Sequence, residues 1–417
     1  MNKQATKNKA VAVLIACIIF NLTIGVLYAW SVLKSKMMAP LELGGWEWTA
    51  AQSGYPYTFA IIFTAVGILI GGKIQDKTGP RWVVTAGGVF CGGGLILSGL
   101  AGDNVMAITF CFGVLTGLGI GFGYGCVTPP ALKWFHPSKK GLISGLIVGG
   151  FGLAAVYIAP LANVLLSHFG LEKAMLMLGV GALIIGVGAA QFVKNPPPGH
   201  IPAVSAKAKE AAAVQAKTAS PDFTLTEMLK TGRFYLMFII FLMTASVGLM
   251  FIGNMTKIAQ TQVGVTDTGA LAAIVAFLAI MNATGRVAGG SLSDKIGRTK
   301  TLYVVLFLQM ANMAAFTYYQ NLAMLIVGIV GVGFCFGTLL SVFPAMTADQ
   351  YGLKNFGGNY GVMFMAWGFS GLLAPVIANY FYDAYGDFGH AYIICAATMG
   401  VMIFVNFALR RNIAART

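Results

Sequence analysis

The sequence has little charge. Only 10% of its 417 residues are Asp, Glu, Lys or Arg, and 57% are hydrophobic. Soluble domains usually carry about 25% charged residues. A chain this apolar cannot cover its surface with polar groups by folding alone. The composition therefore argues against an ordinary soluble domain and indicates a protein embedded in a bilayer.

Acidic residues are especially scarce, with 13 Asp and Glu against 27 Lys and Arg, and the net charge is +14. An excess of this kind is also found in nucleic-acid-binding proteins, but those gather their basic residues on a soluble face. Here the basic residues stand at the ends of apolar runs, which is the pattern of membrane topology. We therefore expect the lipid bilayer as a partner and no nucleic acid.

Paired cysteines are absent as well. The six cysteines lie singly inside apolar stretches, without the short spacing of zinc or redox sites. A buried cysteine behaves as a small hydrophobe, so we expect no metal, no cofactor and no disulfide. No buried acid pair, histidine cluster or nucleophile–base set is visible either, which argues against an enzyme.

Long apolar runs dominate what is present. A helix needs about 20 apolar residues to cross the hydrocarbon core. Runs of that length predict an all-α membrane protein with twelve transmembrane helices, at 11–33, 51–72, 81–101, 105–127, 141–166, 172–194, 233–253, 268–292, 300–320, 323–347, 357–380 and 389–410.

One long polar stretch interrupts these runs. It covers 195–232, begins with three prolines and a glycine, and continues with Ala, Lys and Ser, as a linker does. Its later part, Asp222 to Leu229, is predicted to form a short surface helix. The expected domains are an N-terminal bundle at 1–194, a cytoplasmic linker at 195–232 and a C-terminal bundle at 233–417.

The basic residues also predict the orientation. If the N-terminus is cytoplasmic, 22 of the 27 Lys and Arg lie on the cytoplasmic side, and only Lys34, Lys36, Lys173 and Lys257 lie opposite. Positive residues concentrate on the cytoplasmic side of membrane proteins. We therefore expect a multi-pass protein of the cell's inner (plasma) membrane with both termini cytoplasmic.

A motif occurs once in each half, 218 residues apart. Gly72, Asp76 and Arg81 follow the pattern G-x-x-x-D-K-x-G-x-R after the second helix, and a similar segment follows the eighth helix, with Gly290, Asp294 and Arg298. Glycine lets two helices approach closely, and an aspartate followed by basic residues favours a charge network. The alternative is a pair of generic positive loops. We interpret the motif as the brace of a gate.

This repeated motif resembles the loop motif of the major facilitator superfamily. The resemblance implies two six-helix bundles packed face to face, with substrate near the membrane midplane and alternating access by rocking. Further segments are similar to the oxalate:formate antiporter family, which is related to the monocarboxylate transporters. These are Gly123-Tyr124-Gly125, Lys133-Trp134-Phe135-His136-Pro137 with Lys140-Gly141-Leu142, Ser293 to Arg298, and Asn359-Tyr360-Gly361.

Arg286 is the one charged residue deep within a predicted span. It lies eight residues before Asp294, which places it about 12 Å inside the eighth helix. A buried arginine is costly, so it faces a cavity or a partner. Backbone carbonyls or water would satisfy a structural arginine. The functional alternative is a carboxylate from solution, which the planar guanidinium matches with two hydrogen bonds.

Two further positions refine this hypothesis. Asn282 lies one turn before Arg286 and can donate to a carboxylate or hydroxyl, or else bond a neighbouring helix. Many monocarboxylate transporters carry an Asp there, so its absence argues against proton coupling through that position. The oxalate transporters of the resembled family carry a lysine where Trp367 stands. With a single cation, the cavity favours a monoanion, and Trp367 suggests an apolar wall.

The resemblance also implies aromatic and apolar positions that line the substrate site. Tyr28 and Tyr124 match such positions in the first half, and Tyr124 is expected at a depth similar to that of Arg286. Without the resemblance, each of these side chains would be ascribed to core or lipid-facing packing. The remaining matched positions are Phe151, Phe336, Leu340 and Phe364.

These observations predict a secondary transporter of small monocarboxylates such as lactate or pyruvate, working as a proton-coupled symporter. We expect a small carboxylate anion and a proton as partners, and a monomer. One alternative is a carboxylate exchanger of the oxalate:formate type, against which the missing lysine argues. Another is a carboxylate sensor that no longer transports, against which the lack of a large signalling domain argues.

Overall fold

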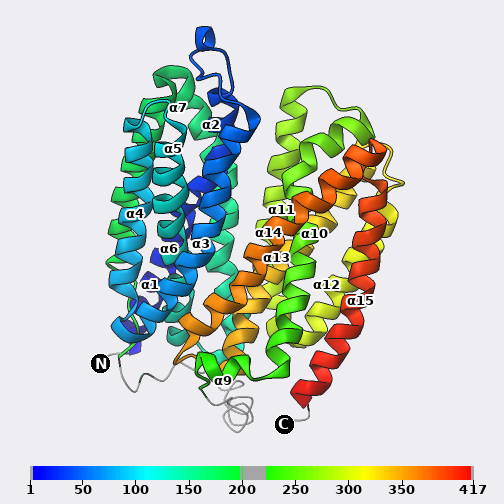
Figure 1. Ribbon diagram of the computed structural model, residues 1–417. Coiled ribbons are helices and arrows are strands. Elements are labelled where there is room, and N and C mark those ends of the chain that lie inside the picture. The colour runs from blue at the N-terminus through cyan, green and yellow to red at the C-terminus, as the bar shows by residue number, and fades with distance from the viewer. Residues whose placement is uncertain (1–2, 198–199, 201–221, 415–417) are drawn as a thin grey trace. The chain divides into compact units, whose positions relative to one another are not determined.

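The computed structural model describes residues 3–197, 200 and 222–414 and contains only helices and their connections over these ranges (Figure 1). The first half consists of α1 (Lys3–Ile24), η1 (Gly25–Ala29), α2 (Trp30–Met37), η2 (Leu41–Leu43), α3 (Ala50–Thr78), α4 (Pro80–Leu100), α5 (Val105–Ile108), η3 (Thr109–Thr116), α6 (Gly117–Trp134), η4 (Pro137–Lys139) and α7 (Lys140–Ala190).

The second half begins with the short helix α9 and continues with six long helices. They are α9 (Leu225–Leu229), α10 (Gly232–Val263), α11 (Thr268–Ile296), α12 (Arg298–Phe316), α13 (Leu322–Tyr351), α14 (Phe356–Tyr385) and α15 (Gly389–Ala414).

The helices supply twelve membrane crossings. Within the described ranges, nine helical stretches are long and apolar enough to span a bilayer. One of them, Pro137–Ala190, contains two crossings, because Gly170 has non-helical angles (φ 75°, ψ 179°) and turns the chain. The long helices α12 and α14 add two more. The predicted all-α fold with twelve transmembrane helices is thereby confirmed.

The observed helices extend beyond most of the predicted spans. For example, α10 continues to Val263 and α13 to Tyr351, each past the end of its apolar run. An apolar run reports only the residues that face hydrocarbon, whereas the hydrogen-bonded helix continues into the interface. The short helix predicted at 222–229 is present as α9. Thr224 and Glu227 form a capping box at its start, and the bonds from Thr224 lower the pKa of Glu227.

The motif glycines make the sharp turns between consecutive helices. Gly79 separates α3 from α4 with φ 88°, and Gly297 separates α11 from α12 with φ 92°. Such positive φ angles are disfavoured for residues with a Cβ. This requirement accounts for glycine at the same place in both copies of the motif.

Contacts divide the chain into two compact units. Unit 1 consists of Met1–Pro137, Gly150–Ala208 and Leu353–Val362, and unit 2 consists of Ser138–Gly149, Lys209–Gly352 and Met363–Thr417. The first turns of α7 thus belong to unit 2, and the first turns of α14 belong to unit 1. The domain limits expected from the sequence, 1–194 and 233–417, stay a prediction.

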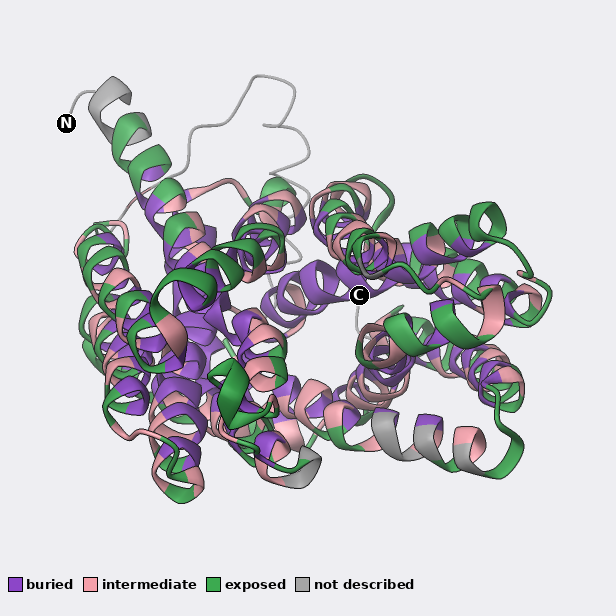
Figure 2. Cartoon of the chain, turned by 90° about the horizontal axis from the view of Figure 1, so that it is seen from above, coloured by how far each residue is buried: buried purple, intermediate pink, exposed green. Residues whose placement is uncertain are grey.

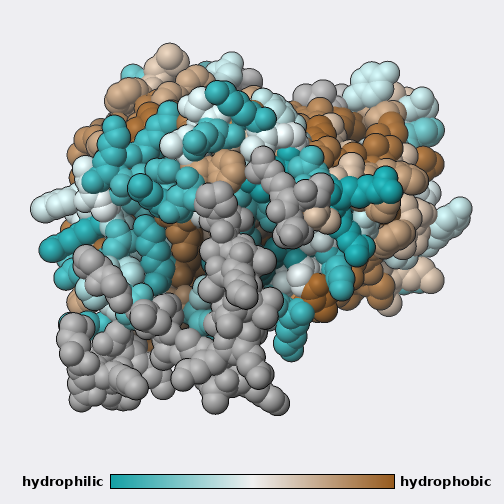
Figure 3. All heavy atoms as spheres, turned by 90° about the horizontal axis from the view of Figure 1, so that it is seen from below, coloured by the Kyte–Doolittle hydropathy of each residue, from teal (hydrophilic) through white to brown (hydrophobic). Residues whose placement is uncertain are grey.

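Burial within the units follows the helix faces. Buried residues lie on the inward faces of the helices, and many large apolar side chains are exposed on outward faces (Figure 2). Hydrophilic side chains gather at the helix ends seen in Figure 3. An apolar outer surface with polar ends is the arrangement that a bilayer requires.

Candidate functional site

Arg286 lies in the second half of α11 and is only 1% exposed. Its Nε donates to Oδ1 of Asn282 at 3.0 Å, and its Nη1 donates to the backbone carbonyl of Val148 at 2.5 Å. The backbone-carbonyl partner that the sequence left open for a structural arginine is therefore present. It satisfies one terminal nitrogen of the guanidinium.

The first turns of α7 bring this carbonyl to Arg286. Gly141, Gly145 and Gly149 are spaced four residues apart and so lie on one helix face. A Cβ on Gly141 would overlap the carbonyl oxygen of Gly290, and one on Gly145 would overlap that of Arg286. Small residues at this spacing allow two membrane helices to pack backbone to backbone. The close approach places the Val148 carbonyl within reach of the guanidinium.

The bond between Arg286 and Asn282 fixes the direction of the amide. The Nε of arginine can only donate, so the asparagine atom facing it is the oxygen, and Nδ2 points elsewhere. Neither Nη2 of Arg286 nor Nδ2 of Asn282 has a hydrogen bond to any residue in the described ranges. No ion pair to Arg286 occurs there either. The pair therefore offers donors only, as an anion requires.

Unit 2 also contains Phe336 and Leu340 on α13 and Phe364 and Trp367 on α14. The first three are buried, and the ring of Phe364 lies 5.1 Å from that of Trp367. Nε1 of Trp367 is buried and has no hydrogen-bond partner among the described residues. Unpartnered buried donors are rare in folded proteins. The ring of Trp367, which we expected to act as an apolar wall, therefore also carries an unpartnered donor. The sequence alone did not indicate that this donor lacks a partner.

In unit 1, the predicted aromatic positions meet in a cluster around Phe151. Its ring centroid lies 5.4 Å from that of Tyr28 and 5.2 Å from that of Tyr124. Tyr28 lies in η1, where the chain leaves regular α-helix, and a Cβ on Gly25 in the same turn would overlap Ala154 of α7. These contacts bring together the three site residues that were predicted in the first half.

Asp294 of the second motif caps the N-terminal end of α7. Its two carboxylate oxygens accept from the backbone N–H groups of Gly141 and Leu142, each at 2.8 Å. A carboxylate at a helix N-terminus satisfies amides that have no partner within the helix. Asp294 also pairs with Arg298 at 2.7 Å.

This network includes two residues that the sequence did not single out for it. Asp349 of α13 pairs with Arg298 at 2.9 Å and with Lys140 at 2.8 Å. Asp349 and Lys140 both lie at helix ends, which is only a weak indication that they pair. They are 209 residues apart in the chain, so their ion pair could not be inferred from spacing.

Asp76 of the first motif makes the matching cap in unit 1. It accepts from the N–H groups of Gly357 and Gly358 at 3.1 and 3.0 Å at the start of α14. Arg81 does not pair with it, however. Its Nε and Nη2 both donate to Gln191. With the glycines of the two copies aligned, Pro80 stands where the second copy has Arg298, so a pair between the motif aspartate and the motif arginine forms in the second copy and not in the first.

No group of three or more His, Cys, Asp or Glu suited to a metal occurs in the part of the chain that the structure describes. The predicted site and motif residues fall into separate groups in the structure. Unit 2 contains the donor pair and a set of aromatic and apolar residues, unit 1 contains an aromatic cluster, and each unit contains one helix start capped by a motif aspartate.

Several transporters are similar to this chain in sequence. The chain is 30% identical over 356 residues to the uncharacterized MFS-type transporter YhjX of Escherichia coli K12, covering 85% of this chain and 84% of that protein. It is 28% identical to the oxalate:formate antiporter of Oxalobacter formigenes (95% and 88% covered) and 25% identical to monocarboxylate transporter 13 of Rattus norvegicus (92% and 85% covered).

A solved structure shares the fold. The Escherichia coli fucose:proton symporter FucP (N162A) superposes with a TM-score of 0.70 at 12% identity, covering 95% of this chain and 98% of the other. The family model of the Major Facilitator Superfamily matches residues 10–341. Members of this family are transporters rather than enzymes, and the chain belongs to the major facilitator superfamily.

Proposed function

We propose that the protein transports small monocarboxylates of the lactate or pyruvate type together with a proton, by alternating access. The observation that carries this proposal is Arg286, a buried cation with no acidic partner in the described ranges. Its Nη2 and the Nδ2 of Asn282 are donors without a partner there. A carboxylate accepts from both and supplies the missing negative charge.

The number of charges favours a monoanion. Arg286 is the only Lys or Arg that the sequence places deep within a span. A dicarboxylate bound to one cation would leave its second charge desolvated and unpaired, which is costly. Trp367 supports the same conclusion, because it stands where the resembled oxalate transporters carry a lysine. Its Nε1 donor suits an oxo or hydroxyl oxygen next to the carboxylate.

We include a proton in this proposal because of the net charge of the carrier over its cycle. Arg286 stays charged at any physiological pH, so the empty carrier exposes an uncompensated cation when it reorients. A bound anion neutralises it, and a proton carried with the anion makes the complete cycle electroneutral. We further propose that both termini are cytoplasmic and that the protein resides in the plasma membrane, as the distribution of Lys and Arg favours.

Thermal stabilisation by ligands tests the anchor. We expect lactate, pyruvate and propionate to raise the melting temperature of the native protein, and oxalate or malonate to have little effect. The Arg286→Ala variant should lose this stabilisation because it removes the cation. Arg286→Lys should lose it because a single ammonium group cannot keep the bonds to Asn282 and Val148 and also donate to the ligand. Equal stabilisation of the native and Arg286→Ala proteins by monocarboxylates would exclude Arg286 as the anchor.

Uptake into proteoliposomes tests the coupling. Labelled lactate should accumulate only when an inward proton gradient is imposed, and a protonophore should abolish the accumulation. Uptake that does not depend on the proton gradient but requires carboxylate inside the vesicle would instead establish exchange. Exchange is the second candidate, and the 28% identity to an oxalate:formate antiporter over 404 residues favours it.

A further inference from the structure

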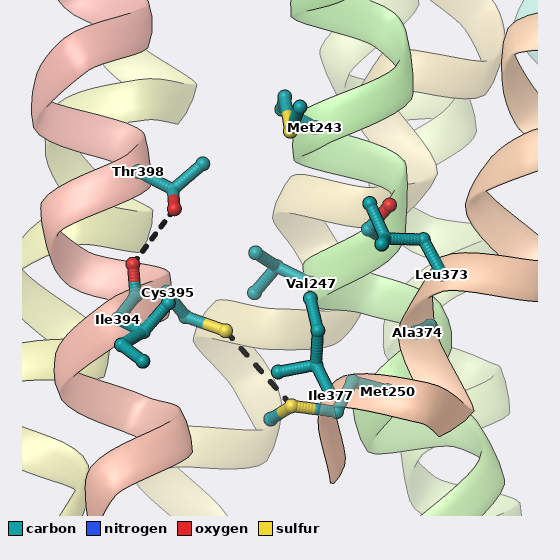
Figure 4. A pocket seen from close by; sticks show the side chains of 10 residues that line it. Met243, Val247, Met250, Leu373, Ala374, Ile377, Ile394, Cys395 and Thr398 are labelled. Carbon is teal, nitrogen blue, oxygen red and sulfur yellow. Dashed lines mark hydrogen bonds between the residues drawn. The ribbon is translucent and has the colours of Figure 1, made fainter. Parts of the chain in front are cut away.

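A cleft of about 330 Å³, counting the open space at its mouth, lies in unit 2 between α10, α14 and α15 (Figure 4). It does not include Arg286 or any other predicted site residue. Its walls are largely apolar, with Met243, Val247 and Met250 from α10, Leu373 and Ile377 from α14, and Ile394 from α15.

The polar groups in the cleft are already satisfied. The hydroxyls of Ser246 and Thr398 each donate at 2.8 Å to a backbone carbonyl of their own helix. The Cys395 thiol points at the sulfur of Met250, 3.9 Å away (Figure 4). A polar ligand would therefore gain few hydrogen bonds here, whereas a hydrocarbon chain would bury its surface against soft, adaptable side chains.

One lining residue of the cleft is exposed, and so are apolar residues close to the lining in the sequence. Ile394 is 41% exposed, and Ile393 on α15 and Leu372 and Phe369 on α14 are at least half exposed. Both α10 and α15 are long and apolar enough to cross a membrane. In such a protein, lipid covers exposed apolar helix surface, so the cleft is open to chains of the bilayer.

A cation stands beyond one end of the cleft. Lys257 follows Met250 by seven residues and so lies on the same face of α10, about 10 Å farther along the helix. Its Nζ lies 3.4 Å from the ring centroid of Tyr382 on α14, the helix that also lines the cleft. The lysine is exposed and has no ion pair with any acid whose side chain the structure describes, a set that leaves out Asp383. An aromatic ring holds it in place without neutralising it.

We propose that this cleft binds one acyl chain of an anionic phospholipid whose head group pairs with Lys257. An apolar slot with a cation past its end matches an amphipathic anion. Met243 and Lys257 are 14 residues apart, which corresponds to about 21 Å of helix, a length that a lipid chain covers and a short carboxylate does not. The bilayer supplies the ligand laterally, since basic residues at membrane interfaces attract anionic head groups.

Native mass spectrometry of the purified full-length protein tests this proposal. The protein is incubated with phosphatidylglycerol or with phosphatidylcholine of the same acyl chains, and the bound lipids are counted. The native protein should retain phosphatidylglycerol several-fold better than phosphatidylcholine. Lys257→Gln should lose this preference. Lys34→Gln, which removes a half-buried lysine near the end of α2 in unit 1, should keep it.

A second measurement locates the chain. Phosphatidylglycerol carrying a photoreactive group on one acyl chain should crosslink to Met243, Val247 and Ile394 in the native protein. Ala374→Phe, which fills the cleft, should suppress these crosslinks and leave others unchanged. An unchanged preference for phosphatidylglycerol in Lys257→Gln would overturn the proposal. So would crosslinks spread evenly over the apolar surface, or retention of free oleate with no retention of phospholipid.

Discussion

Nε of Arg286 donates to Oδ1 of Asn282 at 3.0 Å, one turn earlier on the same helix. This bond turns the amide nitrogen of Asn282 away from the guanidinium and makes both residues donors toward any ligand. The pair offers only donors because the side chain of Asn282 is neutral. An acid at position 282 would itself supply the anion that Arg286 lacks.

We therefore predict that Asn282→Asp weakens binding of monocarboxylates. The new carboxylate would pair with Arg286 inside the protein and compete with the ligand. The expected loss is about tenfold in affinity, or about 1.4 kcal/mol, measured by thermal shift with lactate. Asn254→Asp is the control. Its Nδ2 already bonds the Met250 carbonyl of its own helix, and we expect it to leave lactate binding within about twofold of native.

Arg286 is predictable from the sequence, whereas its backbone partner at Val148 is not. Charges inside apolar runs can be counted directly, and periods of about 20 apolar residues predict the twelve crossings. The Val148 carbonyl could not be predicted, because it depends on how closely α7 approaches α11. For the same reason, the bond of Arg81 with Gln191 escaped detection. Short-range patterns determine which segments are helices, but not which backbone atoms meet.

Trp367 supplies a second prediction, since its Nε1 has no partner in the described ranges. Trp367→Phe keeps a ring beside Phe364 and removes only the donor. We expect it to weaken binding of lactate and pyruvate by about tenfold, because a net hydrogen bond contributes about 0.5–1.5 kcal/mol. Propionate, which has no second oxygen next to its carboxylate, should bind as before.

The control for this change is Trp30→Phe. Its indole Nε1 donates to the Ser53 carbonyl at 3.1 Å, and the residue stacks on Phe112. Its removal should lower the melting temperature without changing the preference between lactate and propionate. An equal loss for lactate and propionate in Trp367→Phe would contradict a donor role for the indole.

The charge of the side chain at position 367 gives a third prediction. Trp367→Lys adds to Arg286 a second cation within the predicted spans of unit 2, and we expect oxalate to stabilise this variant although it does not stabilise the native protein. Two cations can neutralise a dianion that one cation leaves half unpaired. Trp367→Gln, which removes the ring without adding charge, should not respond to oxalate. A native protein that oxalate stabilises as strongly as lactate would contradict the monoanion assignment.

The glycine face of α7 offers a matched pair of substitutions for a fourth prediction. A Cβ on Gly145 would overlap the carbonyl oxygen of Arg286, whereas a Cβ on Gly149 would meet a Val287 methyl at 3.4 Å. Overpacking costs about 1–3 kcal/mol. Gly145→Ala should therefore lower the melting temperature and lactate uptake together, and Gly149→Ala should leave both near native. Similar effects of the two substitutions would show that the close approach at Gly145 is unimportant.

The two motif aspartates are not equivalent, and this gives the last prediction. Asp76 and Asp294 each accept from two backbone N–H groups, but only Asp294 also binds an arginine, Arg298. Hydrogen bonds to charged groups contribute about 1.5–3 kcal/mol. Asp294→Asn removes that charge and leaves Asp349 as the one carboxylate paired with Arg298 in the described ranges. We expect it to lower the melting temperature more than Asp76→Asn does, by about 2–4 °C for each additional kcal/mol.

Raising the salt concentration should narrow this difference in melting temperature, because the extra contribution at Asp294 is electrostatic and partly exposed to screening. Equal losses at both positions, unaffected by salt, would mean that the helix caps alone account for the two aspartates.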